Sequence, residues 1–430
     1  MRKRILVWLC AVTAAFALLA MEASAANYTG CADSLSQLGL FQGTGNPQDP
    51  YELDRAPNRY EAAVMLVRLL GRERQALDEN NAHPFTDVPA WAGKHVGYLY
   101  QNGLTKGSTA TVFGGEACTA QMYAAFVLRA MGYSDAPGGD FMYNGAVVYA
   151  QTLGLYTAEQ GFLRDDAVVM SYGALVTPCK DGKLLLEKLV EGGAVDTARA
   201  QPLLDRYRIY HALSESMRPF EGAYALDQSV TVDMTIEMQG LSMNFGIENR
   251  MQLSTQNGLR YATTTRYTGI MAQADESYYY DGQSFYQANQ DGRMRYQCDE
   301  ETARLMLPDN SGITAPTQFW PIDDITVATQ GGETVYTVKI DASLQAVMAE
   351  AAGTLGNMGV GLRDFEYTLC MFVRDGVFQR SELAATYAYE VEGQIAHANM
   401  KVVTKVNGVD AAVTVPGPTD ISSYIDGGAI

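Results

Sequence analysis

Residues 83–132 read HPFTDVPAWAGKHVGYLYQNGLTKGSTATVFGGEACTAQMYAAFVLRAMG and contain two short amphipathic patterns. In the first pattern, apolar residues recur at helical spacing from Ala92 to Leu99 and stop at Gly103, a typical helix end. In the second, they share one face from Tyr123 to Ala130, before Gly132. Neither helix can bury its apolar stripe alone. The stretch therefore predicts a helical unit that packs against copies of itself.

The same pattern recurs on both sides of this stretch. Upstream, the two helices are repeated in CADSLSQLGLFQG (31–43) and NRYEAAVMLVRLLG (58–71). Downstream, they are repeated with a weaker stripe in 141–155 and 162–175, and the Gly-Leu pair that ends the first helix occurs in all three copies. The sequence therefore predicts a helical domain over 27–195, built of three tandem repeats at about 27–75, 83–134 and 138–190.

These repeats resemble the surface-layer homology (SLH) repeats of Gram-positive cell walls. That family's unit opens with Phe-x-Asp, ends its first helix in Gly-Leu and starts its second helix with a Thr-Arg-Ala-Glu-like motif. Here the opening is Phe85-Thr86-Asp87. The start of the second helix reads Asn58-Arg59-Tyr60-Glu61 in the first copy and Leu163-Arg164-Asp165-Asp166 in the third. In the second copy it reads Thr119-Ala120-Gln121-Met122, which lacks both charges.

The resemblance implies non-covalent anchoring to an anionic, for example pyruvylated, secondary cell wall polysaccharide. Arg59 and Arg164 would grip a carboxylate by paired hydrogen bonds, with Glu61 and Asp166 orienting them. The helix N-termini add donors for an anion, and Trp91 offers a ring for stacking on a sugar. The alternatives are self-paired, solvated charges at the helix starts and a packing role for Trp91.

The N-terminus has the pattern of a secretory signal peptide. Arg2-Lys3-Arg4 precedes an apolar run over 5–20, and Ala23-Ser24-Ala25 offers small residues for cleavage. We predict a signal peptide over 1–25, with a membrane anchor as the alternative. No later stretch is long and apolar enough to span a bilayer. The protein is therefore expected outside the cell, associated with the wall or the surface layer.

The net charge restricts the possible partners. The formal net charge is −18, which disfavours nucleic acid and anionic membrane surfaces. An acidic wall polymer would also be repelled on average, so any contact with it must use local arginines.

Loss of Cys10 with the signal peptide leaves five cysteines, an odd number that excludes complete internal pairing. We expect mostly buried or unpaired thiols.

Beyond the repeats the hydrophobic period changes. A linker helix is predicted over 198–220, and from 221 to 425 the period becomes two, as in Val230–Met238. Tight-turn pairs separate the strands: Asn257-Gly258, Asp281-Gly282, Asp291-Gly292, Asp375-Gly376 and Asn407-Gly408. The segment 343–355 reads as a helix that covers the open face of the sheet. The predicted fold class is multidomain α + β, with an all-α repeat bundle followed by a curved, mostly antiparallel sheet.

The second half resembles the superfamily of lipoprotein-carrier (LolA-like) half-barrels and their Gram-positive secreted relatives. The resemblance rests on the long meander, the covering helix and the tyrosine-rich hairpin at 279–286. In that superfamily the cavity between sheet and helices holds lipid or another apolar molecule. It implies an apolar ligand here, with Met234, Met238, Tyr279 and Phe285 as candidate lining residues. Alternate strand residues face opposite ways, so at most half of the tyrosine run shares one face. An ordinary sheet core is the alternative.

Signals for catalysis are weak. The four histidines are scattered, and we find no nucleophile elbow, phosphate-binding loop or calcium loop. Carboxylate pairs such as Asp323-Asp324 are common in acidic chains. We therefore expect neither enzymatic activity nor a cofactor or metal.

Together these patterns predict a non-catalytic surface protein that its repeats anchor and whose sheet domain binds an apolar ligand or partner. One rival is a purely structural surface-layer component. A more remote one is a wall-modifying enzyme, which needs two facing carboxylates in a cleft. A deep apolar pocket favours the first interpretation, and a filled core with a flat exposed patch favours the second.

Overall fold

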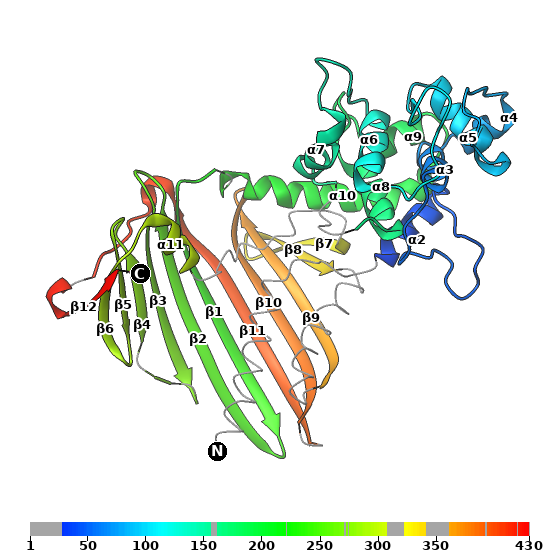
Figure 1. The fold of residues 1–430 in the computed structure, drawn as a ribbon. Coiled ribbons are helices and arrows are strands. Elements are labelled where there is room, and N and C mark those ends of the chain that lie inside the picture. The colour runs from blue at the N-terminus through cyan, green and yellow to red at the C-terminus, as the bar shows by residue number, and fades with distance from the viewer. Residues whose placement is uncertain are drawn as a thin grey trace.

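The computed structural model of the protein describes residues 28–155, 161–220, 222–270, 272–273, 275–307, 322–340, 361–391, 394–418 and 420–429. The predicted signal peptide (1–25) and the predicted covering helix (343–355) lie outside these residues. Figure 1 shows a group of short helices and a large curved sheet, joined by the long helix α10 (Thr197–Met217). Among the helices that the structure describes, none is long and apolar enough to cross a membrane.

Helices occupy the predicted repeat segments. In the described residues, the three pairs are α2 with α3, α5 with α6, and α7 with α8, and α4 and α9 follow the first and third pairs. Their bounds are α2 (Thr29–Gln37), α3 (Arg59–Leu69), α4 (Glu73–Asp78), α5 (Ala90–Gln101), α6 (Ala120–Ala130), α7 (Ala146–Thr152), α8 (Arg164–Val176) and α9 (Leu185–Glu191).

The first helix of each pair ends in the same way, which explains the recurrent Gly-Leu pair. The glycine has a left-handed backbone, which glycine adopts without a Cβ penalty. The N–H of the next leucine then bonds back to the helix, as Leu104 does to the carbonyl of Leu99 at 2.8 Å. The φ angles are 76°, 69° and 72° for Gly39, Gly103 and Gly154.

The pairs are interleaved into a ring. The second helix of each pair packs on the first helix of the next: α3 on α5, α6 on α7, and α8 back on α2. The helices α3, α6 and α8 also contact one another, so the three second helices meet at the centre. Leu66, Leu99, Leu128 and Leu175 are fully buried in the resulting core. Each apolar stripe is therefore covered by a helix of a neighbouring pair.

Within the described residues, twelve strands form one open sheet, in the order β12-β6-β5-β4-β3-β2-β1-β11-β10-β9-β8-β7. All neighbours are antiparallel except β12 and β6, which are parallel. The bounds are β1 (Ala225–Met238), β2 (Leu241–Ser254), β3 (Arg260–Gly269), β4 (Glu276–Tyr280), β5 (Ser284–Asn289), β6 (Gly292–Gln297), β7 (Ile322–Gln330), β8 (Glu333–Ile340), β9 (Gly361–Arg374), β10 (Val377–Val391), β11 (Gln394–Val409) and β12 (Ile425–Ala429). The prediction of a mostly antiparallel sheet is confirmed.

One of the predicted turns is wrong. Asn407-Gly408 lies inside β11, opposite a register shift between Asp227 and Gln228 of β1. The Asn407 side chain donates to Asp227 Oδ1 at 3.1 Å, so this pair extends the ladder and does not reverse the chain. The turn pairs named from the sequence do not include the one between β1 and β2. That hairpin turns at Gln239-Gly240, where both residues have positive φ. The other four predicted pairs lie at the junctions of consecutive strands, with Gly292 as the first residue of β6.

The two faces of the sheet differ, and we call the face that carries Met234 the inner face. The register places Met400 of β11 and Phe245 of β2 directly opposite Met234. The helix α11 (Glu300–Leu305) packs on this face, where Tyr261 Oη donates to the Ala303 carbonyl at 3.2 Å. Leu213 of α10 joins buried residues of β7–β10 on the same face. Figure 1 shows both helices near one end of the sheet.

Helix α10 belongs to both parts of the molecule. Its N-terminal half contributes Leu203 and Leu204 to the helical core, and its C-terminal half contributes Leu213 to the core on β7–β10. Between them, the Arg206 guanidinium donates to Tyr172 Oη of α8 at 2.7 Å and to the Asp323 carbonyl of β7. The predicted linker helix is therefore a packed connector whose two halves lie in two different cores.

Candidate functional site

The first candidate site is the contact that we call the Arg59 seam, formed by Arg59, Ser108, Phe113 and Glu116. Arg59 is the first residue of α3, but its guanidinium reaches the loop of the second copy and is only 7% exposed. It donates to Ser108 Oγ and to the Phe113 carbonyl, and it lies 4.6 Å from the centre of the Phe113 ring. Glu116 Oε1 is 3.7 Å away. Arg59 therefore joins two copies.

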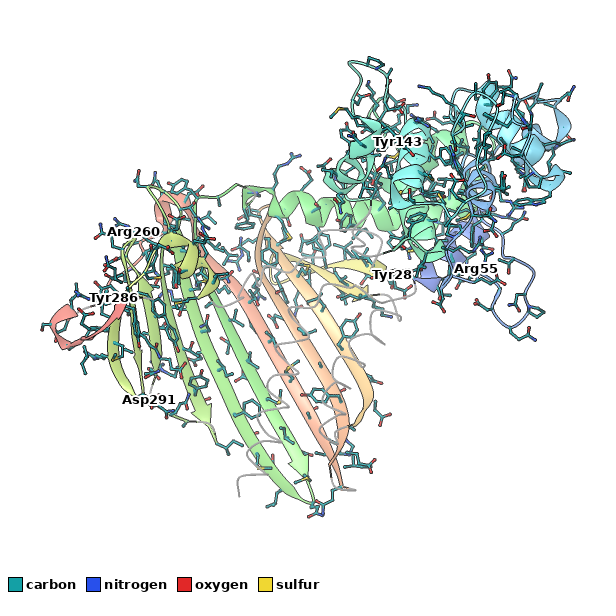
Figure 2. The ribbon with its side chains drawn as sticks, viewed as in Figure 1. Tyr28, Arg55, Tyr143, Arg260, Tyr286 and Asp291 are labelled. Atoms are coloured by element: carbon teal, nitrogen blue, oxygen red, sulfur yellow. The ribbon has the colours of Figure 1, made fainter. Side chains whose placement is uncertain are left out.

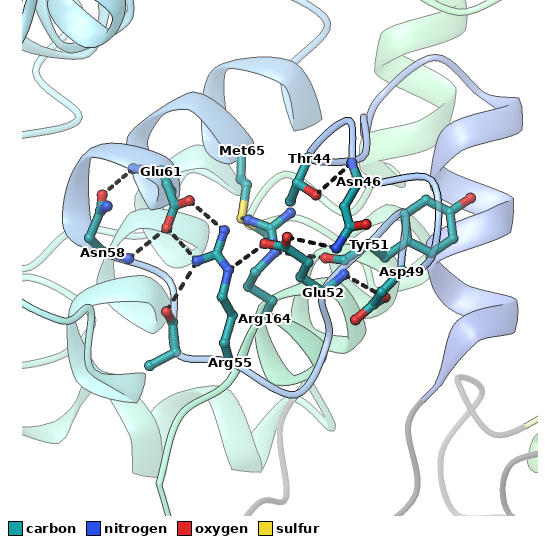
Figure 3. A network of polar contacts seen from close by, with 11 residues as sticks. Thr44, Asn46, Asp49, Tyr51, Glu52, Arg55, Asn58, Glu61, Met65 and Arg164 are labelled. Atoms are coloured by element: carbon teal, nitrogen blue, oxygen red, sulfur yellow. Dashed lines mark hydrogen bonds and ion pairs between the residues drawn. The ribbon is translucent and has the colours of Figure 1, made fainter.

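Glu61 does not orient Arg59, contrary to the expectation from the motif. Figure 3 shows that Glu61 instead takes two hydrogen bonds from Arg55, at 2.7 and 2.9 Å. Its Oε2 also accepts the Asn58 N–H, while Asn58 Oδ1 accepts the Glu61 N–H, so the two residues form a capping box. Burial acts to raise the pKa of Glu61, but the Arg55 hydrogen bonds bring it below its ordinary value. Glu61 is a helix cap paired with Arg55.

The equivalent contact in the third copy, the Arg164 seam, consists of Arg164, Phe41, Tyr51 and Met65. Arg164 is 4% exposed, and its Nε donates to the Tyr51 carbonyl at 2.8 Å. Nη1 lies 3.9 Å from Met65 Sδ (Figure 3). The guanidinium lies 5.6 Å from the centre of the Phe41 ring. No carboxylate among the described residues forms an ion pair with it. Burial, and then the neighbouring Arg55, lower the pKa of Arg164.

Asp166, like Glu61, caps its own helix. Its Oδ2 accepts the Leu163 N–H at 2.6 Å. Burial raises the pKa of Asp166 above its ordinary value, against this backbone donor. The adjacent Asp165 accepts the Tyr28 N–H at 2.7 Å and so ties the third copy to the start of the first. The two arginines are therefore held in separate seams, while Glu61 and Asp166 cap their own helices, and neither arginine pairs with the acid two positions on.

Trp91 is the exposed member of the predicted polysaccharide site. It is 55% exposed in the first turn of α5. Its ring meets the Tyr60 ring edge-on, with centroids 6.3 Å apart, and Tyr60 stacks on Phe113 at 5.7 Å. Tyr60 Oη donates to the Asp87 carbonyl at 2.9 Å. Trp91 thus extends the Arg59 seam to the surface as an aromatic platform.

Sequence reasoning missed Tyr60 and Asp87, which build this platform. The Asp87 carboxylate accepts the N–H groups of Phe113 and Gly114, both at 2.8 Å. Burial acts to raise the pKa of Asp87, but these backbone donors bring it below its ordinary value. The signal was present in the sequence, because Asp87 is the acid of the Phe-x-Asp opening.

The second candidate site is the inner face of the sheet. Met234 is buried at its centre, within a cluster of apolar residues from β1, β2, β10 and β11, and Met238 packs against that cluster. Phe285 lies on the same face further along the sheet, in the group that packs under α11. The cluster is Val230, Val232, Met234, Ile236, Phe245, Ile247, Ala385, Tyr387, Ala396, Ala398, Met400 and Val402.

Tyr279 lies on the other face. The register pairs it with Ala262 and Tyr286, one position out of phase with Phe285. Tyr286, labelled in Figure 2 beside β12, meets the Tyr424 ring edge-on at 5.4 Å. Three of the four predicted lining residues therefore share the inner face, and Tyr279 does not.

The inner face also carries a polar group that the sequence analysis did not identify. Glu276 of β4 accepts the hydroxyls of Tyr267 and Tyr278 on Oε2, both at 3.3 Å. Thr265 stands opposite Glu276 and accepts the Asn249 side-chain amide at 2.9 Å. Burial, and then the Glu276 charge, raise the pKa of Tyr267 to about 12. The alternation of β4 could have placed Glu276 and Tyr278 on one face, but only the register brings Tyr267 of β3 to the same side.

Metal-ligand groups and disulfides are both absent among the residues that the structure describes. No group of three or more His, Cys, Asp or Glu side chains there could hold a metal ion. No two of the described cysteines form a disulfide, and four of the five are buried. Burial raises the pKa of Cys118 to about 12, which leaves this thiol protonated.

Comparison with known proteins leaves the family open. Neither the protein-family models nor the curated proteins contain a match. Among solved structures, LprF from Mycobacterium bovis is 13% identical with a TM-score of 0.28, and the match covers 50% of this chain and 98% of that one. A DUF1329 family protein from Desulfovibrio piger is 9% identical with a TM-score of 0.20, over 48% and 92%. An outer membrane lipoprotein-sorting protein domain from Vibrio parahaemolyticus is 9% identical with a TM-score of 0.17, over 49% and 94%. At these identities and scores, the likenesses support no inference about what this chain binds.

Proposed function

We propose that this protein is an exported, non-catalytic surface protein with two binding surfaces. Its helical repeats hold an anionic secondary wall polysaccharide, as the SLH resemblance implies, and its sheet domain binds an apolar ligand on the inner face. The exposed platform of Trp91 on Tyr60 beside Arg59 is the observation that carries the anchoring half. No cofactor or metal takes part, and nucleic acid is not a partner.

The geometry of the Arg59 seam supports a sugar on Trp91. An indole ring presents a flat apolar face for a sugar ring, and the ordered Tyr60 beneath it restricts its motion before binding. Arg59 lies close behind this platform, so an acidic substituent on the glycan is drawn towards the seam. The ligand approaches along the exposed edge of the seam, because Arg59 itself is buried.

Trp91→Ala is expected to weaken retention on purified wall sacculi by about tenfold, the loss of one stacking contact. The variant should fold normally, because the side chain is mostly exposed. Val148→Ala, an exposed apolar position on α7, is the matched control and should bind as the native protein does. If Trp91→Ala is retained on sacculi as well as Val148→Ala, the proposal that Trp91 binds the wall polysaccharide is wrong.

The composition of the inner face supports an apolar ligand on the sheet. Four adjacent long strands, β2, β1, β11 and β10, carry the buried cluster around Met234 on their inner face. Charged residues such as Asp233 and Lys401 lie on the outer face of β1 and β11. The described helices α10 and α11 pack near one end of this face. Methionines on such a face adapt to varied apolar shapes. The rival, a structural surface-layer component, predicts a face that binds nothing.

The full-length secreted protein is expected to bind the neutral fluorescent probe N-phenyl-1-naphthylamine, with a blue-shifted, saturable signal. Met238→Glu should weaken this binding at least about tenfold, because it places a charge at the border of the apolar cluster. Asn399→Glu, an exposed outer-face position on β11, adds the same charge as a control. A folded native protein that does not bind the probe would leave the structural interpretation in place.

A further inference from the structure

The inner face has a charge that an apolar-ligand surface does not need. Among the described residues that the register places on the inner face of β1–β6, β10 and β11, Glu276 is the one charged side chain. The basic residues of β2, β3 and β6, including Arg250 and Arg266, have the opposite phase and lie on the outer face. The sheet therefore separates Glu276 from the described basic residues of β2, β3 and β6.

All the described partners of Glu276 are neutral. Oε2 accepts the hydroxyls of Tyr267 and Tyr278, and Oε1 accepts the Gln273 amide at 3.3 Å. No lysine or arginine of the described chain forms an ion pair with it. A half-buried carboxylate with neutral donors alone gains more from a cation than one that is already paired. The site is thus complementary to a positive charge.

A second polar group on the same face lacks a partner. Thr263 is 1% exposed, and its Oγ1 has no hydrogen-bond partner among the described residues. The register places it opposite Tyr278 and two residues along β3 from Thr265, which faces Glu276. A buried hydroxyl without a partner costs free energy. A polar group of a ligand lying against this part of β3 and β4 would satisfy it.

Tyr267 connects this polar strip with the apolar surface. Its ring packs against the cluster around Met234, while its hydroxyl bonds Glu276. The ring of Tyr267 thus lies at the border between the apolar cluster and the carboxylate of Glu276. Tyrosine rings beside a carboxylate also attract an ammonium group through their faces.

We propose that Glu276 receives the ammonium group of a cationic amphiphile whose apolar part lies on the cluster around Met234. Tyr267 and Tyr278 flank the ammonium, and the Thr263 hydroxyl accepts or donates a hydrogen bond to the polar end. This inference rests on the proposed apolar-ligand function and specifies its ligand class. A fatty acid anion is disfavoured at the same place, because its carboxylate would meet Glu276.

The test is competition for N-phenyl-1-naphthylamine at pH 7 with three matched chains: dodecylamine, dodecanol and dodecanoate, each below its micelle concentration. The native full-length protein should bind dodecylamine about tenfold more tightly than dodecanol, and dodecanoate most weakly. Glu276→Gln, which keeps shape but not charge, should abolish the preference for the amine and leave probe and dodecanol binding unchanged. Glu248→Gln, on the outer face of β2, is the control and should keep the preference.

The outcomes separate the two proposals. If the native protein binds the probe but ranks amine and alcohol equally, or if Glu276→Gln keeps the preference, the ammonium assignment is wrong and the apolar-ligand function stands. If the probe does not bind at all, both fail together. Thr263→Val serves as a second variant, since it removes only the buried hydroxyl. It should reduce affinity for dodecylamine and dodecanol but not for the probe, and equal losses for all three would argue against a polar role.

Discussion

Arg164→Ala is expected to lower the free energy of unfolding of the helical part by about 2–4 kcal/mol. The substitution removes a guanidinium that is buried between the first and third copies. It leaves the Tyr51 carbonyl without its donor and opens a cavity beside Phe41 and Met65. Arg59→Ala should act similarly, because it breaks the contact with Phe113 in the other seam.

The measurement is chemical denaturation followed by circular dichroism, with Arg74→Ala as the matched control. Arg74 lies on α4 with a side chain that is 96% exposed, and its ion pair with Asp78 is a surface one worth little. Arg164→Lys should recover only part of the loss, because lysine cannot reproduce the Nε donor to Tyr51 while covering the Phe41 ring. Equal stability of Arg164→Ala and the control would mean that these arginines are not structural. Wall-binding losses in either arginine variant have meaning only after this effect on folding is measured.

The same leucine-to-alanine substitution in the two halves of helix α10 should destabilise two different parts of the molecule. Leu204→Ala and Leu213→Ala are each expected to cost about 2–5 kcal/mol, the usual cost of truncating a buried leucine. The losses should appear in different places, because Leu204 belongs to the helical core and Leu213 to the core on β7–β10. Hydrogen exchange should therefore rise in α8 and α9 for the first variant and in β8–β10 for the second.

Ser214→Ala, an exposed position next to Leu213, is the control and should change neither pattern. If both leucine variants loosen the same half of the molecule, α10 does not serve as a connector between two cores. If each also raises exchange in the opposite half, the two halves unfold together through the helix. That result would define one cooperative unit and would rule out independently folded fragments on either side of α10.

Much of the architecture follows from the sequence because it depends on local conformation. The Gly-Leu pairs mark the ends of α2, α5 and α7, since the left-handed backbone there favours glycine and the next residue must turn back to the helix. The alternation in Val230–Met238 marks a strand with one apolar face, which β1 has. Turn pairs such as Asp375-Gly376 mark hairpins for the same local reason.

Only the tertiary structure decides which residues meet. Arg59 and Glu61 are two positions apart in the sequence, yet Arg59 bonds Phe113 and Glu61 bonds Arg55. Asn407-Gly408 has the composition of a turn, but it pairs inside the ladder beside Asp227. Glu276 becomes an isolated charge only because the register of β3 and β4 turns the nearby arginines to the other face. Backbone conformation is a property of a few neighbouring residues, whereas these partners are chosen by register and by packing between segments that are distant in the chain.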